Sequence, residues 1–449
     1  MELIINPSRS EWPRLCARPS DDNAVVRERV AAILEQVRTQ GDEALKALSR
    51  EIDGVTLECL EVSEAEFAQA DALVGGDVKR AIARAAANIR AFHEAQRPRT
   101  VDLETQEGVR CLQRAVPIRR VGLYIPGGSA PLFSTVLMLA IPAQVAGCEE
   151  IVLCTPPAKR SPVKPGMTDA SSWPTRSAIP SPAAIPAPEV LYAARYCGVR
   201  KVFKAGGAQA VAAMAYGTGS IPAVDKIFGP GNQYVTTAKQ LLGGKTVAID
   251  MPAGPSEVMV LADRTARKEC VAADLLSQAE HGPDSQVMLV CEEEALAREI
   301  MEEVSRQSSA LPRAAIAARA LDKSRAVVFP DRETMTAFAD AYGAEHLILS
   351  VRDPWEIADR ITCAGSVFVG PWSPESAGDY ASGTNHTLPT SGWARAFNGV
   401  NLDSFVRKIT FQELTKDGLE ALAPTITTLA EAEGLWAHAN AVTIRLQDE

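Results

Sequence analysis

The sequence predicts an α/β protein built from two Rossmann-like α/β lobes, with a helical N-terminal arm and a helical C-terminal tail. The chain has 449 residues, more than one hydrophobic core usually holds, so two or more lobes are expected. Short apolar runs that end in glycine-rich turns alternate with helical segments, which is typical of parallel sheets covered by helices. The hydrophobic fraction of 46% and the charged fraction of 23% are those of an ordinary globular protein.

The first part of the chain predicts an arm followed by helices. Residues 1–23 contain Pro7, Pro13 and Pro19 and are expected to form an arm outside the core. Residues 24–50 carry apolar side chains at helical spacing. Ser63 followed by Glu66 predicts a capping box, which starts a helix that runs toward residue 96 and holds a solvated His93.

After residue 115 the pattern changes to strand, glycine turn and helix. Four β-like runs predict an α/β lobe over residues 116–239, and they cover residues 121–125, 151–154, 201–204 and 226–228. In such sheets ligands bind beyond the carboxyl ends of the strands, where these glycine turns lie. Residues 156–188 are rich in proline and serine and predict an exposed insertion in this lobe.

Further β-like runs predict the other lobe. They cover residues 258–261, 286–290, 326–329 and 366–369. We assign this lobe to residues 240–385 together with residues 24–115. Residues 386–449 are expected to form a helical tail that contacts a neighbouring subunit.

Composition excludes several classes of partner. The net charge is −10 and no basic stripe is present, so we expect no nucleic-acid partner. No apolar stretch is long enough to cross a bilayer, and the N-terminus lacks the pattern of a secretion signal. The nine cysteines form no CxxC pair, which indicates reduced thiols. We therefore expect a cytoplasmic protein without a membrane partner.

Two short segments contain candidate metal ligands. Gln278 and His281 lie three residues apart and share a face if helical, so they suit a divalent ion. A helix end capped by Gly282 explains the same pattern without a metal. Asp379 and His386 belong to a segment dense in small residues that lets backbone approach a ligand, although a turn held by an Asx hydrogen bond fits too.

Two other segments contain acids beside imidazoles. Glu345 and His346 are adjacent and could share proton-transfer work, although the start of an ordinary strand would look the same. Glu433 and His438 are too far apart for one face of a straight helix. His438 is a candidate ligand because it would complete a set of two histidines, a carboxylate and an amide, which is a plausible site for a divalent ion.

The sequence indicates a dinucleotide site less clearly than a metal or acid–base site, because no GxGxxG motif follows the first strand of the lobe at residues 116–239. Its glycine turns either expose N–H groups to phosphates or are merely sharp turns.

Taken together, the motifs resemble those of the histidinol dehydrogenase family. The matching segments span the chain from about residue 25, and they are VGLYIPGGSAP (121–131), GGAQA (206–210), KIFGPGNQYVTTAK (226–239), DMPAGPSE (250–257), DLLSQAEHGPDSQ (274–286), EHL (345–347), SPESAGDYASGTNHTLPT (373–390) and the Glu433 to His438 tail. The resemblance implies an oxidoreductase of histidine biosynthesis that converts L-histidinol, 2 NAD⁺ and water to L-histidine and 2 NADH through L-histidinaldehyde. It also implies one zinc ion per subunit and a homodimer with shared active sites.

The resemblance also implies roles for individual residues. Zinc would be held by Gln278, His281 and Asp379 of one chain and by His438 of the partner subunit. His346 would be the general base and Glu345 the activator of water. Substrate would contact Ser256, His386 and Glu433 in addition to His346 and the zinc ligands. NAD would contact Tyr124, Gln209 and Asn232.

The chain departs from the family pattern in two places. The connection at residues 156–188 is longer than usual, and Ala344 stands where the family usually has proline.

Three alternatives remain at the level of sequence. One is an aldehyde-dehydrogenase-like mechanism with a covalent thiohemiacetal on Cys154. Another is a different zinc- and NAD-dependent amino-alcohol dehydrogenase on the same scaffold. The last is a metal-binding dimer without enzymatic activity, which would have no need for Glu345 beside His346.

Overall fold

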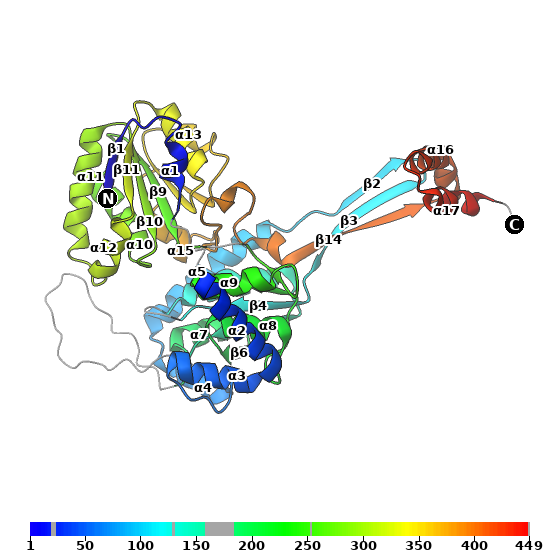
Figure 1. Ribbon diagram of the computed structural model, residues 1–449, viewed down its shortest axis with the longest axis horizontal. Helices are drawn as coiled ribbons and strands as arrows, with labels where there is room; N and C mark the ends of the chain where they lie inside the picture. The colour runs from blue at the N-terminus through cyan, green and yellow to red at the C-terminus, as the bar shows by residue number, and fades with distance from the viewer. Residues whose placement is uncertain (19–23, 128–130, 158–183, 252–253, 448–449) are drawn as a thin grey trace.

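The computed structural model describes residues 1–18, 24–127, 131–157, 184–251 and 254–447. Figure 1 shows two α/β lobes, and a narrow arm that projects from them and ends in a pair of helices. The predicted fold class of two parallel-sheet lobes is confirmed. Most of the predicted insertion, residues 158–183, lies outside the described residues.

One lobe is built on a five-stranded parallel sheet with the strand order β6-β5-β4-β7-β8. Four of its strands were predicted from their apolar runs, and β8 adds a short edge strand that extends the lobe beyond residue 239. The strands are β4 (Arg120–Tyr124), β5 (Glu150–Thr155), β6 (Lys201–Lys204), β7 (Lys226–Phe228) and β8 (Ala248–Ile249). Helices α6 (Phe133–Ala146), α7 (Pro188–Tyr196), α8 (Gly207–Tyr216) and α9 (Gln233–Leu242) connect and cover them.

The early helices pack on this lobe, which corrects the assignment of residues 24–115 to the other lobe. Helix α2 packs against α8 and α9, α4 against α7, and α5 against α6. The apolar stripe of α2 is buried with the alanine-rich face of α8, where small side chains permit close approach. The elements are α2 (Ala24–Gln40), α3 (Asp42–Leu48), the π-helix η1 (Ser49–Asp53), α4 (Glu64–Leu73) and α5 (Gly76–Ala95).

Two local predictions in this segment have opposite outcomes. The capping box is confirmed, because Ser63 and Glu66 exchange side-chain and backbone hydrogen bonds at the start of α4. The prediction of a solvated His93 is wrong. This side chain is fully buried, and its Nδ1 lies 2.8 Å from the carbonyl oxygen of Ile89.

The other lobe is built on a six-stranded parallel sheet with the order β1-β11-β10-β9-β12-β13. Its strands are β1 (Glu2–Ile5), β9 (Glu257–Ala262), β10 (Gln286–Cys291), β11 (Arg325–Val328), β12 (His346–Ser350) and β13 (Ser366–Val369). Its helices are α1 (Trp12–Cys16), α10 (Lys268–Ala279), α11 (Glu294–Ser308), α12 (Ala314–Leu321), α13 (Arg332–Tyr342), α14 (Trp355–Ala358) and α15 (Glu375–Tyr380).

The prediction of a separate N-terminal arm over residues 1–23 is wrong for the described part. Strand β1 pairs with β11 along its whole length and so completes one edge of the sheet. Trp12 and Leu15 are buried, and Trp12 packs edge-on against Phe329 and Phe338. The apolar side chains between the prolines therefore anchor this segment in the core. Residues 19–23 lie outside the described residues.

The projecting arm contains an antiparallel sheet that was not predicted. It is formed by β2 (Val101–Gln106), β3 (Val109–Pro117) and β14 (Val406–Leu414), and it leads to α16 (Lys416–Ala432) and α17 (Trp436–Leu446) at its far end (Figure 1). The prediction of a wholly helical tail over residues 386–449 is thus wrong for β14. Almost every residue of β2 and β14 is exposed, so neither strand carries the alternating apolar pattern that identifies a half-buried strand. Two 3-10 helices, η2 (Trp393–Arg395) and η3 (Leu402–Phe405), precede β14.

No helix in the described ranges is both long enough and apolar enough to cross a bilayer.

Candidate active site and metal centre

The predicted acid–base pair lies at the amino end of a central strand. His346 is the first residue of β12, which runs between β9 and β13, and Glu345 directly precedes it. Both side chains are buried. The Glu345 Oε2 accepts a hydrogen bond of 2.9 Å from the backbone N–H of Glu257, and His346 Nδ1 lies 3.4 Å from the carbonyl oxygen of the same residue. The first residue of β9 thus fixes both side chains.

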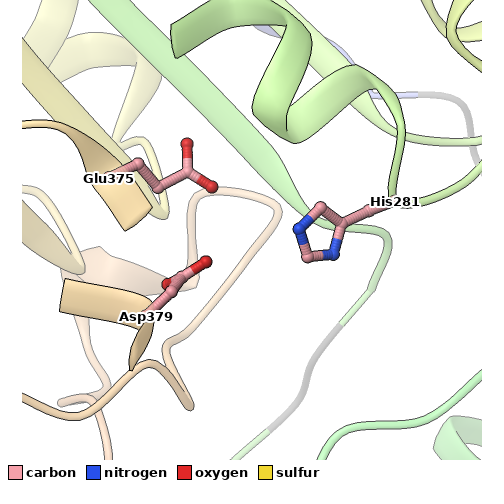
Figure 2. Close-up of side chains that lie close together, drawn as sticks. All are labelled: His281, Glu375 and Asp379. Atoms are coloured by element: carbon pink, nitrogen blue, oxygen red, sulfur yellow. The ribbon is translucent and has the colours of Figure 1, made fainter. Parts of the chain in front are cut away.

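The predicted metal ligands come from two helix ends that meet beside this pair. Gln278 lies in the last turn of α10 and His281 just beyond it, while Asp379 lies in α15. Figure 2 shows the carboxylates of Glu375 and Asp379 facing the imidazole of His281. One ligand atom from each of these three residues lies within 4.8 Å of the others.

The polar atoms of this cluster fit a cation. Both carboxylate oxygens of Glu375 and the amide oxygen of Gln278 are buried, and they have no hydrogen-bond partner among the described residues. Buried oxygens without partners are unfavourable unless something else satisfies them, and a divalent ion does so. Both oxygen and nitrogen donors are present, as zinc prefers.

The two groups of residues form a single site. His346 Nε2 lies 3.5 Å from Asp379 Oδ1, and His346 Nδ1 lies 3.7 Å from Glu345 Oε2 and 4.0 Å from Glu375 Oε1. Segments about a hundred residues apart in the sequence therefore converge around one imidazole, as the sequence predicted for Glu345, His346, His281 and Asp379.

Burial and charge shift the pKa values of these groups in opposite ways. Burial would lower the pKa of His346, but the carboxylates of Glu375, Glu345 and Asp379 outweigh it and raise the value to about 10. Burial raises the pKa of Glu345 and of Glu375 to about 8, against the opposing effect of His346. His281 is exposed to solvent, yet partial desolvation by its neighbours lowers the pKa of its imidazole from the usual value, which favours the neutral form that binds a metal.

Two predicted substrate contacts lie next to these residues. His386 Nδ1 lies 2.9 Å from the carbonyl oxygen of Asp379, and its Nε2 lies 3.2 Å from Oγ1 of Thr135 in α6 of the five-stranded lobe. His386 therefore links the two lobes. Ser256 is half-buried and directly precedes Glu257 at the start of β9.

The three predicted NAD contacts gather at the carboxyl edge of the five-stranded sheet. Tyr124 ends β4, Gln209 lies in the first turn of α8, and Asn232 caps α9 by accepting hydrogen bonds from two backbone N–H groups. Tyr124 and Gln209 are buried. The Tyr124 hydroxyl oxygen accepts a hydrogen bond of 3.0 Å from the N–H of Gly207, and burial raises the pKa of Tyr124 to about 12.

The tail residues are not brought to the site of their own chain. Glu433 and His438 are exposed, in the loop between α16 and α17 and in the first turn of α17. Figure 1 shows these helices at the far end of the arm, away from α10 and α15.

Sequence reasoning missed Glu375. It begins α15, four residues before Asp379, so both carboxylates share one face of that helix. The spacing was visible in the segment around Asp379, but it predicts a shared face only once that segment is known to be helical.

Comparison with known proteins agrees with the motifs. A family model described as histidinol dehydrogenase matches residues 16–172 and 175–446. The chain belongs to the histidinol dehydrogenase family. A curated histidinol dehydrogenase of Bacteroides thetaiotaomicron is 52% identical over 446 residues, which cover 99% of each chain. That of Escherichia coli K12 is 52% identical over 416 residues, which cover 92% of this chain and 90% of the relative.

A crystal structure of histidinol dehydrogenase from Elizabethkingia anophelis superposes with a TM-score of 0.92 at 48% identity, over 99% of this chain and 98% of that one. The predicted family and fold class are thus confirmed, and with them the oxidoreductase class.

Proposed function

We propose that the protein oxidises L-histidinol to L-histidine through L-histidinaldehyde, with two NAD⁺ reduced and one water consumed. Membership of the histidinol dehydrogenase family supports this reaction. The observation that carries it is the convergence of a buried acid–base pair with a set of metal-ligating side chains around His346.

His346 and Glu345 divide the proton transfers, and both act in their deprotonated forms. Positive charge from bound zinc would favour these forms, because it would offset the carboxylates that raise the pKa of His346 and oppose the rise that burial causes in the pKa of Glu345. His346 takes the hydroxyl proton as a hydride leaves the carbinol carbon for the first NAD⁺. Glu345 accepts a proton from the water that adds to the aldehyde carbon. His346 gives its proton to the carbonyl oxygen as the hydrate forms. It then takes one hydroxyl proton from the hydrate while a second hydride reduces the second NAD⁺, and the resulting carboxylic acid releases its remaining proton to solvent as the carboxylate. Both groups are buried, so they act where bulk water is excluded.

Zinc would be held by Gln278, His281 and Asp379, with His438 of the partner subunit, and the unpartnered oxygens of Glu375 lie in the same cluster. When bound, zinc supplies positive charge that orients the amino and imidazole nitrogens of the substrate. Ser256, His386 and Glu433 are proposed substrate contacts beside these ligands.

We propose that NAD binds at the carboxyl edge of the five-stranded sheet. The strand order reverses between β4 and β7, and ligands of such sheets bind in the crevice at that point. The turn after β7 and the N-terminus of α9 flank this crevice. Tyr124, Gln209 and Asn232 are grouped at this edge, and the N–H groups at the start of α9 suit a phosphate.

A homodimer would bring the tail to a second active site. The arm carries exposed apolar side chains, among them Leu429 at 61%, Trp436 at 67% and Ile444 at 57% exposure. Such surfaces on a projecting element favour burial against a second copy of the chain. We also propose a cytoplasmic location, because all nine cysteines lie in the described residues and are unpaired thiols.

The assay measures NADH formed per molecule of substrate by the purified zinc-loaded protein. We expect two NADH per L-histidinol, loss of activity with a chelator and its return with zinc. If L-histidinol yields no NADH while another amino alcohol does, the chain is a different amino-alcohol dehydrogenase. Activity that persists without metal would contradict the proposed role of the cluster.

A further inference from the structure

We propose that Arg18 is a positioning residue for the acid–base pair, acting through Glu257. The inference rests on the proposed roles of Glu345 and His346. It concerns the segment before α2, which carries no residue of the predicted site.

The link between Glu257 and the pair runs through backbone. Glu257 offers its N–H to Glu345 and its carbonyl oxygen to His346, at 2.9 Å and 3.4 Å respectively. A small movement at the start of β9 would therefore displace both reacting side chains together.

The side chain of Glu257 is held by Arg18. Arg18 Nε and Nη2 each donate to one carboxylate oxygen of Glu257 at 2.8 Å, and the two side chains are 13% and 1% exposed. Such a bidentate contact fixes the orientation of the Glu257 carboxylate as well as its distance from Arg18. Without Arg18, Glu257 would be a buried carboxylate with no other ion-pair partner among the described residues, which is strongly unfavourable.

Arg18 also holds the turn that leads into β12. Its Nη2 donates to the carbonyl oxygen of Tyr342 at 2.9 Å, and its guanidinium carbon lies 3.6 Å from the centroid of the Tyr342 ring. Tyr342 ends α13, and only Gly343 and Ala344 separate it from Glu345. The Tyr342 hydroxyl donates to Gln286, which pairs with Glu257 in the sheet.

One guanidinium thus joins the start of β9 to the turn before β12. These are the two segments whose relative position sets the contacts of Glu345 and His346. A displacement of about 1 Å in a catalytic group can reduce a rate by as much as roughly a hundredfold.

The test compares Arg18→Ala and Arg18→Lys with two matched variants of the same segment. Arg9→Ala removes an arginine that packs over Trp12 without reaching Glu257, and Leu15→Ala loosens the buried anchor. We expect kcat to fall by roughly 10- to 100-fold in Arg18→Ala and less in Arg18→Lys, with KM for L-histidinol and zinc content unchanged. Arg9→Ala should keep kcat, and Leu15→Ala should lower Tm yet keep kcat below that temperature.

A second measurement separates positioning from general destabilisation. In a Glu345→Gln background, Arg18→Ala should reduce kcat by a smaller factor than in the wild type, because one of the positioned groups no longer acts. An equal factor in both backgrounds, or a kcat that follows Tm across all variants, would overturn the inference. So would an Arg18→Ala protein with wild-type kcat. An inactive wild-type protein would instead overturn the proposed function, and the inference with it.

Discussion

The position of His438 at the end of the projecting arm leads to a test of active-site sharing. Two variants are made, His281→Ala in the core of the site and His438→Ala in α17. Each homodimer should be inactive, because each of its sites lacks one zinc ligand. When the two are mixed and allowed to exchange subunits, a mixed dimer has one site with both defects and one site with neither.

The expected activity follows from this geometry. Random pairing of equal amounts makes half of the dimers mixed, and each mixed dimer has one intact site out of two. The mixture should therefore reach about one quarter of the wild-type kcat per chain, and mixed dimers isolated with two affinity tags should reach about one half. If His438 served its own chain, every site would keep one defect and the mixture would stay inactive.

The assay follows NADH at saturating L-histidinol and zinc, before and after subunit exchange. Gel filtration confirms that both variants remain dimers, and each variant mixed with itself serves as the control. Absence of recovery in verified mixed dimers would refute the shared site. Activity of the His438→Ala homodimer would show that the tail histidine is not a required ligand.

Three further outcomes follow from the buried groups. Glu375→Gln should weaken zinc binding by roughly 10- to 100-fold in a chelator competition, because it removes a buried carboxyl group that faces His281 and could ionise beside a bound cation; unchanged affinity would place Glu375 outside the metal's surroundings. Metal-free protein should lose thermal stability as the pH rises from about 5 to 9. The folded state holds protons on Glu345 and Glu375 up to a pKa of about 8, while the unfolded chain releases them near 4.5. A Tm that rises between pH 5 and 9 in the presence of chelator would contradict the predicted loss of stability. Cys154→Ser should keep kcat within about twofold, because burial raises the pKa of this thiol far above neutrality, whereas a thiohemiacetal mechanism requires complete loss.

Periodicity in the sequence identified most strands that lie inside the two sheets, but not β12, whose start at His346 was considered only as an alternative explanation of the Glu345–His346 pair. Strands such as β5 and β10 are apolar along most of their length because helices cover both faces, so a local window suffices to find them. Strand β1 was missed because it is only four residues long and is followed by a segment that contains three prolines. Strands β2 and β14 of the arm were missed because almost all of their residues are exposed and they carry no alternating apolar pattern.

Assignment of the early helices failed for a different reason. The apolar stripe of α2 shows that the helix is buried on one side, but nothing in the stripe says against which sheet. That choice depends on the alanine-rich surface of α8 and on the apolar side chains of α9, which are distant in the sequence. Likewise, Arg18 could not be recognised from its neighbours, since its partners lie 239 and 324 residues away.

Ligands of parallel sheets usually bind beyond the carboxyl ends of the strands, but the position of the acid–base pair shows that this rule applies to only one of the two lobes. The proposed NAD crevice lies at the carboxyl edge of the five-stranded sheet, whereas Glu257 and His346 begin their strands at the amino edge of the six-stranded sheet. A hydride moves only between atoms in contact, so the two edges must face each other. His386 makes that connection, because its imidazole joins Asp379 of the metal cluster to Thr135 in the first turn of α6, directly after β4. The neighbouring Asn385 reinforces it with a hydrogen bond of 2.6 Å to the Met138 carbonyl oxygen of the same helix. In the proposed function, opposed edges of the two parallel sheets would therefore bring cofactor and substrate together, an arrangement that neither lobe's sequence pattern reveals alone.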